Sequence, residues 1–121
     1  MTTIHSLEKA VKKAWTKDTC YPPDRNTWTK EKPEVGQCAV TALIVQDEFH
    51  GDIVYNSQFD HYYNILPSGK KMDLTKGQFS TKITGPSIVV NRDEILYSPN
   101  AQKFKTLQRY RLLKKRLDQE D

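Results

Sequence analysis

The most apolar stretch of the chain covers residues 36–45 and follows a polar, proline-containing loop. Helix-forming and small residues continue from there to Phe49, and Gly51 then provides a stop. A helix that is apolar on nearly all sides belongs in the interior of a domain. The pattern therefore predicts a central, buried helix, with Gly36 allowing a tight turn or a close backbone approach just before it.

Two amphipathic helices are expected to flank this central helix. Residues 4–15 place hydrophobic side chains at helical spacing, and Thr3 or Ser6 can cap the first turn. Residues from about 100 to 117 predict a final helix with basic residues on its outer face. Its inner hydrophobic stripe consists of Phe104, Leu107, Tyr110, Leu113 and Leu117.

The remaining regular pattern is that of β-strands. The last strand is rich in β-branched residues and is predicted to be buried. The whole pattern predicts an α+β fold, in which the central helix packs on an antiparallel sheet of about four strands. We expect one domain over residues 1–121, with a core over about 4–97 and the basic helix over about 100–117. The predicted strands are 52–59, 61–66, 71–75 and 87–91.

The sequence Pro67-Ser68-Gly69 joins the second and third predicted strands. Proline followed by glycine at this spacing is typical of a three-residue hairpin loop with a bulge. In that register Asp73 lies opposite Tyr63, on the same face as His61 and diagonal to it. Diagonal neighbours are roughly 7–8 Å apart, within reach of a long polar contact. A two-residue loop would place His61 and Asp73 on opposite faces.

The composition is that of a globular protein, with 36% hydrophobic and 28% charged residues. No apolar run is long enough to cross a bilayer, so no membrane partner is expected. Charged residues interrupt the N-terminal hydrophobic pattern, which argues against a signal peptide and for a cytoplasmic location. Two widely spaced cysteines and three histidines predict neither a disulfide framework nor a zinc site. We therefore expect no metal and no other cofactor.

The net charge of +4 is concentrated near the C-terminus. Residues 103–116 carry seven lysines and arginines and no acidic residue. Such a stripe can contact phosphates, but it is more often the solvated face of a surface helix. Nucleic-acid binding is therefore not favoured, and the sequence leaves the oligomeric state open.

Three residues could together perform nucleophilic catalysis. Cys38 lies in the first turn of the central helix, where unpaired N–H groups and the helix dipole favour a thiolate. His61 is then a candidate base, and Asp73 a candidate for orienting it. Backbone N–H groups of the helix start, together with Gln37 or the preceding loop, could stabilise an oxyanion. The alternative is that Cys38 is a small residue of the hydrophobic core.

For the other candidate residues, a structural role is expected, and a functional role is the alternative. The segment 17–35 is long for a loop, which suggests a function or packing by its own side chains. Trp28 is expected to anchor this loop, and its alternative role is as one wall of a substrate groove. Asn64 falls on the face opposite His61 and is expected to be structural, with an orienting amide as the alternative. Surface positions are expected for His5 and His50, and Cys20 is expected to be either buried or a bystander.

Three segments carry a resemblance to a known family: Gly-Gln-Cys-Ala-Val-Thr-Ala-Leu (36–43), His-Tyr-Tyr-Asn-Ile-Leu-Pro-Ser-Gly (61–69) and Asp-Leu-Thr-Lys-Gly-Gln-Phe (73–79). Together they resemble the small bacterial YunG-like proteins, over about residues 8–80. More distantly, they look like papain-like or transglutaminase-like cysteine hydrolases, including toxin domains that deamidate glutamine. Where those domains have their cysteine, histidine and acid, this chain has Cys38, His61 and Asp73. The resemblance implies a papain-like fold.

The residues and the resemblance together favour a cysteine-dependent hydrolase or acyl transferase of the amidase, deamidase or peptidase type. Its substrate would be an amide or ester carbonyl, which could belong to a protein. The alternative is a catalytically silent binding protein with the same fold. Such a protein would use the 17–35 loop or the basic helix to hold its partner.

Overall fold

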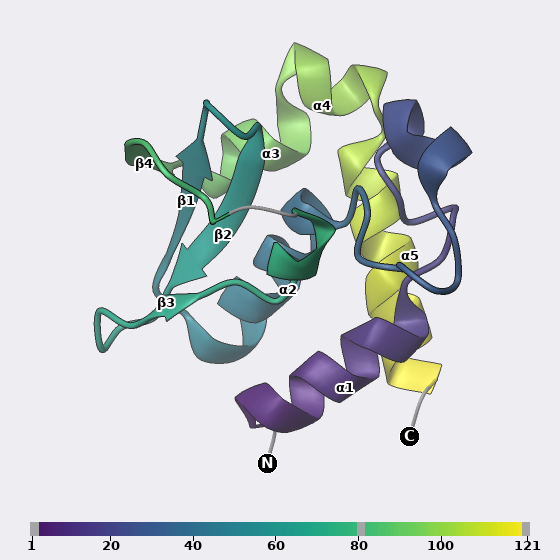
Figure 1. The fold of residues 1–121 in the computed structure, drawn as a ribbon, viewed down its shortest axis with the longest axis horizontal. Coiled ribbons are helices and arrows are strands. Elements are labelled where there is room, and N and C mark those ends of the chain that lie inside the picture. The colour runs from purple at the N-terminus through teal and green to yellow at the C-terminus, as the bar shows by residue number, and fades with distance from the viewer. Residues whose placement is uncertain (1–2, 80–81, 120–121) are drawn as a thin grey trace.

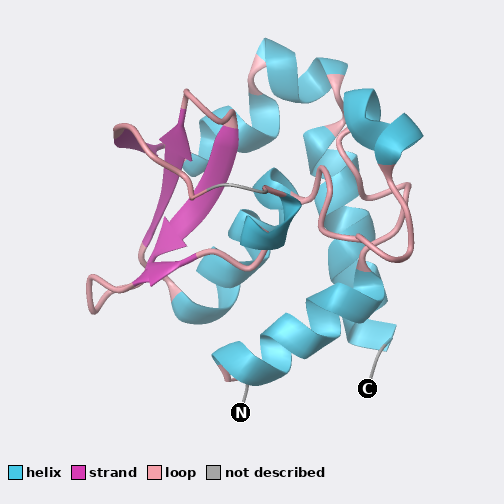
Figure 2. Cartoon of the chain, in the orientation of Figure 1, coloured by secondary structure: helices cyan, strands magenta, loops and turns pink. Residues whose placement is uncertain are grey.

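The computed structural model of the protein describes residues 3–79 and 82–119 and has an α+β architecture. The predicted domain also includes residues 1–2, 80–81 and 120–121, which lie outside this description. An antiparallel sheet forms one side of the molecule, α2 lies in the middle, and α5 lies on the other side (Figure 1). Figure 2 shows the strands gathered at one side and the helices around and beside them.

The helices of the described residues include five α-helices and two short 3-10 helices. None of them is long and apolar enough to cross a membrane. The α-helices are α1 (Ile4–Ala14), α2 (Cys38–Phe49), α3 (Arg92–Tyr97), α4 (Pro99–Lys103) and α5 (Thr106–Gln119), and the 3-10 helices are η1 (Pro22–Thr27) and η2 (Lys76–Gln78).

The sheet has four strands in the order β3-β2-β1-β4, and all neighbouring strands are antiparallel. The turn between β2 and β3 has the predicted register, because Ile65 pairs with Lys71. Within this turn the Gly69 N–H donates to the Leu66 carbonyl over 2.8 Å. The strands are β1 (Asp52–Asn56), β2 (His61–Ile65), β3 (Lys71–Met72) and β4 (Ser87–Val90).

The predicted central helix is confirmed as α2, which begins at Cys38 and ends at Phe49. Val40 and Leu43 of this helix are completely buried, as expected for a helix that packs against the sheet on one side and α5 on the other. Removing a leucine side chain from water stabilises the fold by about 2 kcal/mol. The side chain of Thr41 is also satisfied, since it accepts a 2.9 Å hydrogen bond from the Trp15 indole.

The predicted first helix is confirmed as α1, and its cap is built as the sequence suggested. The Thr3 side chain accepts from the Ser6 backbone N–H, and the Ser6 side chain accepts from the Thr3 N–H. This reciprocal capping box satisfies two N–H groups that have no partner inside the helix.

Two predicted strands are shorter than expected, because side chains redirect the backbone into turns. β3 ends at Met72 rather than Thr75, since the Asp73 carboxylate accepts a hydrogen bond from the Thr75 N–H at 3.2 Å. β1 ends at Asn56 rather than Phe59, since the Asn56 side-chain oxygen accepts from the Phe59 N–H at 3.1 Å. Aspartate and asparagine form such turns readily and thereby compete with strand pairing.

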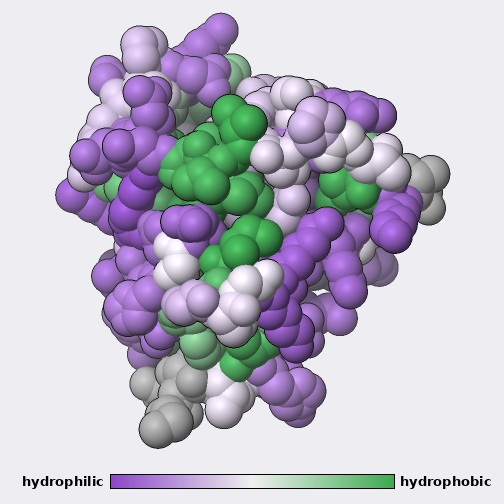
Figure 3. Space-filling view, turned by 90° about the vertical axis from the view of Figure 1, so that its left-hand side faces the viewer, coloured by the Kyte–Doolittle hydropathy of each residue, from purple (hydrophilic) through white to green (hydrophobic). Residues whose placement is uncertain are grey.

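The prediction that the last strand is buried is wrong. β4 is an edge strand that pairs only with β1, and Ile88 and Val89 are 63% and 64% exposed. Its β-branched residues favour a strand, but composition does not specify a place in the sheet. Figure 3 shows hydrophobic surface gathered at the centre of the side of the molecule that carries the sheet.

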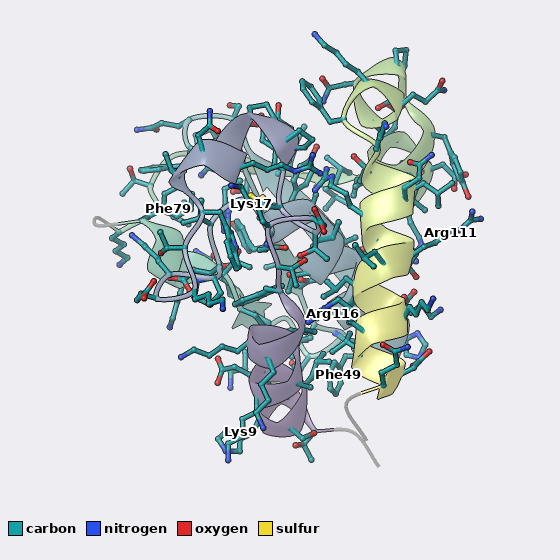
Figure 4. The ribbon with its side chains drawn as sticks, turned by 90° about the vertical axis from the view of Figure 1, so that its right-hand side faces the viewer. Lys9, Lys17, Phe49, Phe79, Arg111 and Arg116 are labelled. Atoms are coloured by element: carbon teal, nitrogen blue, oxygen red, sulfur yellow. The ribbon has the colours of Figure 1, made fainter. Side chains whose placement is uncertain are left out.

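The predicted C-terminal helix is divided in two at Lys105, which has a left-handed φ of 57°. The predicted inner stripe is partly confirmed, since Tyr110 and Leu113 are buried in the core. The prediction that the basic residues lie outside is wrong for Arg109, which is only 4% exposed. Arg111 does lie on the outer side of α5, whereas Arg116 reaches α1 and donates to the Ala14 carbonyl (Figure 4).

Candidate functional site

A cavity of about 380 Å³ lies at the N-terminal end of α2. Its walls come from the 17–35 loop, the first turn of α2, the turn between β1 and β2, and the segments from α3 to α5. The residues that line the cavity therefore come from widely separated positions in the sequence. The lining includes Tyr21, Asp24, Cys38, Phe59, Asp60, Tyr62, Phe79 and Arg109.

Cys38 lines this cavity as the first residue of α2 and is half-buried. The preceding residue, Gln37, makes no side-chain hydrogen bond to the start of the helix. The first intrahelical bond runs from the Thr41 N–H to the Gln37 carbonyl over 3.0 Å. The N–H groups of Cys38 and Ala39 therefore precede the helical hydrogen-bond ladder and give the helix start a partial positive charge.

His61 is the first residue of β2 and is completely buried. Its Nε2 atom lies 2.7 Å from the Asp73 Oδ2 atom. The other Asp73 oxygen accepts a hydrogen bond from the Thr75 N–H, so the carboxylate is held from both sides. The Phe79 ring packs edge-on against the imidazole, with 4.8 Å between ring centroids. The predicted hairpin register thus brings His61 and Asp73 into direct contact.

The Cys38 sulfur lies close enough to the His61 ring to influence its pKa. Burial by itself lowers the pKa of His61, but the interactions with Asp73 and Cys38 outweigh it and raise the pKa to about 9. The ring therefore carries a proton at neutral pH and can hold it beside the sulfur.

Gln37 is completely buried but does not face the cavity with its amide. Its Nε2 donates to the Thr16 carbonyl at 3.0 Å, and its Oε1 accepts from the Thr19 hydroxyl at 2.8 Å. These bonds fasten the chain after α1 to the residue just before Cys38. The side chain of Gln37 is thus placed to position the helix start.

Replacing Gln37 with leucine is expected to destabilise the protein by about 1–3 kcal/mol, because the buried Thr19 hydroxyl and the partly buried Thr16 carbonyl each lose a hydrogen bond. We expect the alkylation rate of Cys38 in the folded variant to stay within about twofold of the wild-type rate. Urea unfolding and alkylation kinetics measure the two effects, with Gln102→Leu at an exposed position as the control. A large loss of Cys38 reactivity in a stably folded variant would instead point to an oxyanion role for the Gln37 amide.

Two other candidate residues do not line the cavity and make hydrogen bonds to the backbone instead. Trp28 is not among the residues that line the cavity, and its indole N–H donates to the Pro33 carbonyl at 3.0 Å. Asn64 is buried and donates to the Ala42 carbonyl of α2 at 3.0 Å. The first side chain braces the 17–35 loop, and the second joins the sheet to α2.

Cys20 is fully buried, and burial raises the pKa of its thiol to about 11. It lies close to Gly36, where an added Cβ atom would come within 2.5 Å of the Cys20 sulfur. Gly36 also has a φ of 71°, so both the turn and the close approach expected before α2 are present. Cys20 is therefore a buried thiol under the loop.

Sequence reasoning missed Arg109 and Tyr21 as cavity residues. Arg109 was assigned to a solvated basic face, and no local signal distinguishes it from its neighbours. Tyr21 lies in the loop, where it packs against Phe104 with 4.7 Å between ring centroids. Within residues 3–79 and 82–119, no group of three His, Cys, Asp or Glu side chains is arranged to hold a metal ion.

Comparison with known proteins gives a family. The sequence model of the YunG protein family matches residues 3–120. A relative from Bacillus subtilis (strain 168), described as "Uncharacterized protein YunG", is 33% identical over 107 residues. That alignment covers 86% of this chain and 87% of the relative. No solved structure matches the chain.

Proposed function

The chain belongs to the YunG family, and from this premise we propose that it is a cysteine-dependent hydrolase or acyl transferase acting on an amide or ester carbonyl. Cys38 is the nucleophile in this proposal, His61 is the acid and base, and Asp73 orients the imidazole. The helix bearing the cysteine and the hairpin bearing the other two residues would correspond to the core of a papain-like enzyme. The observation that carries the proposal is the 2.7 Å contact between His61 and Asp73, and the influence of the nearby Cys38 sulfur on the pKa of the same ring supports it.

In the first half of the reaction, the Cys38 sulfur attacks the carbonyl carbon and forms a C–S bond. The carbonyl electron pair moves to oxygen, and the N–H groups of Cys38 and Ala39, which precede the helical hydrogen-bond ladder, would stabilise that negative charge. When the tetrahedral intermediate collapses, the bond to the leaving nitrogen or oxygen breaks. The leaving group takes the proton from His61, and a thioester remains on Cys38.

In the second half, a water molecule attacks the thioester and gives a proton to His61. The C–S bond breaks, the carboxylic acid is released, and the thiolate and protonated His61 are restored. An amine or alcohol in place of water would make the same cycle an acyl transfer. Asp73 does not exchange a proton in either half, because its role is to fix the ring and stabilise its charged form.

Alkylation of Cys38 by iodoacetamide tests this proposal without knowledge of the substrate. At pH 6.5 we expect a rate about tenfold or more above that of a free peptide thiol, because His61 stabilises the thiolate. His61→Gln is expected to remove most of that advantage, and His5→Ala, at an exposed position on α1, is expected to leave it intact. Mass spectrometry assigns the modification to Cys38, since Cys20 is buried in the native protein.

A Cys38 rate no higher than that of a free thiol, and equal in His61→Gln, would contradict the catalytic proposal. The family would then be better described by the alternative of a binding protein with the same fold. In that case Cys38→Ser should leave its biological activity unchanged.

A further inference from the structure

The cavity beside Cys38 contains a buried positive charge on Arg109. This side chain is 4% exposed, although it belongs to a helix rich in solvated basic residues. Its Nε donates to the Phe104 carbonyl at 2.9 Å, and its terminal nitrogens donate to the Thr19 carbonyl at 3.3 Å and the Thr106 hydroxyl at 3.2 Å. The guanidinium is therefore firmly oriented by neutral oxygen atoms.

No carboxylate of the described residues forms an ion pair with Arg109. The two salt bridges found among those residues join His61 to Asp73 and Arg92 to Asp47. A guanidinium also has more N–H groups than the three described bonds use. Burying a charge without an ionic partner is unfavourable, so a retained charge of this kind calls for a partner that arrives from outside.

Arg109 also lies within electrostatic range of the Cys38 sulfur. Burial lowers the pKa of Arg109, and the negative charge of a Cys38 thiolate acts in the opposite direction. The guanidinium still keeps its proton at neutral pH. Together with the partial positive charge of the α2 start, this charge favours an anion next to the sulfur.

The cavity wall also carries the acidic residues Asp24, Asp60 and Glu94, and none of them forms a salt bridge with Arg109 among the described residues. Asp60 accepts a hydrogen bond from the Tyr55 hydroxyl and is exposed, as is Glu94. Burial and the nearby Asp60 raise the pKa of Asp24. These carboxylates disfavour a highly charged ligand such as a phosphate and leave room for a singly charged one.

We propose that Arg109 binds a carboxylate of the substrate, so that the acyl compound attacked by Cys38 carries a free carboxylate near its reactive carbonyl. The remaining N–H groups of the guanidinium form the charge-assisted bonds, a geometry for which arginine is well suited. A cavity of about 380 Å³ accommodates a small acyl group or the end of a longer chain. The Arg109 site rests on the nucleophilic role proposed for Cys38.

Two alkylating agents that differ only in charge test this site. Iodoacetate carries a carboxylate, and iodoacetamide is its neutral counterpart. We expect the ratio of their rates at Cys38 to exceed the ratio for glutathione by about tenfold, because Arg109 attracts the anion. Arg109→Gln should abolish this excess and Arg109→Lys should keep part of it. Arg111→Gln removes the same charge from the exposed face of α5 and should change nothing.

The ratio separates the two proposals. A high ratio that depends on Arg109 supports the anion site even if both rates are slow, whereas slow rates by themselves contradict the nucleophilic role of Cys38. Fast alkylation with the same ratio as glutathione overturns the anion site alone. The comparison with glutathione uses the wild-type protein. It therefore tests the anion site even if Arg109→Gln fails to fold.

Protection experiments distinguish the sources of the carboxylate. N-acetylglycine and N-acetylglycinamide represent a small ligand with and without the charge, and a hexapeptide with a free or amidated C-terminus represents a chain end. Stronger protection of Cys38 against iodoacetamide by N-acetylglycine than by its amide assigns a small-molecule substrate. Protection by the peptide acid alone assigns a polypeptide terminus. Equal protection by each acid and its amide contradicts carboxylate recognition.

Discussion

Replacing Asp73 with asparagine is expected to lower the pKa of His61 from about 9 toward its ordinary value of 6.5. The hydrogen bond from Asp73 opposes the effect of burial on the imidazole, and an amide cannot stabilise the charged ring in the same way. NMR titration of the His61 ring measures the shift. Asp60→Asn is the matched control, because that carboxylate also lines the cavity but contacts Tyr55 rather than His61.

The same substitution should change how stability depends on pH. His61 has a folded pKa of about 9 against 6.5 when unperturbed, so its contribution is fully present below pH 6.5 and is lost as the pH rises through 9. That contribution is at most about 3 kcal/mol. We expect the wild-type free energy of unfolding to fall over this window more steeply than that of Asp73→Asn, as measured by urea titration. Cys20 titrates equally in both proteins and cancels in the comparison.

Parallel pH dependences of the two proteins, or an unchanged His61 titration, would show that Asp73 does not control the protonation of the ring. The orienting role would then have to be assigned to another neighbour of His61, and the catalytic proposal would lose its third residue.

Gly51→Ala is expected to lower the free energy of unfolding by about 3 kcal/mol or more, or to prevent folding. Gly51 has a φ of 79°, and an added Cβ would lie 2.3 Å from the Ile65 carbonyl oxygen. The clash is with backbone, so relief would require the end of α2 to move away from β2. Urea unfolding of the purified variant measures the loss.

Gly69→Ala separates the clash from the backbone strain. Gly69 has a similar φ of 89°, but nothing lies within 4 Å of an added Cβ there. We expect this variant to lose only about 1 kcal/mol, the effect of a left-handed alanine. Equal losses in the two variants would show that the close approach between Gly51 and β2 contributes nothing to the packing of α2 on the sheet.

The central part of the fold and the His61–Asp73 pair could be predicted because their signals are local. The apolar run after Gly36 predicts α2, and the turn at residues 67–69 sets the pairing of β2 with β3. Once that register is known, alternation along a strand places His61 and Asp73 on one face. The local register of the hairpin was therefore sufficient to predict the His61–Asp73 pair.

The edge position of β4 and the shortened β3 were beyond the reach of the same reasoning. A β-branched composition does not reveal how many neighbours a strand has, and Ile88 and Val89 are exposed because β4 pairs only with β1. The end of β3 depends on whether the Asp73 carboxylate bonds to the backbone at Thr75 or elsewhere. In both cases the outcome follows from competition between interactions of similar strength.

The sequence by itself determined that Cys38 starts a buried helix and that His61 and Asp73 share one face of a hairpin. Only the tertiary structure decided that Cys38 comes close enough to His61 to influence its pKa, and that Arg109 lines the same cavity as Cys38. Arg109 donates to Thr19, 90 residues earlier in the chain, after the backbone breaks at Lys105. Periodicity describes a helix and its immediate neighbours. A buried charge is placed by contacts between distant segments, which no local pattern encodes.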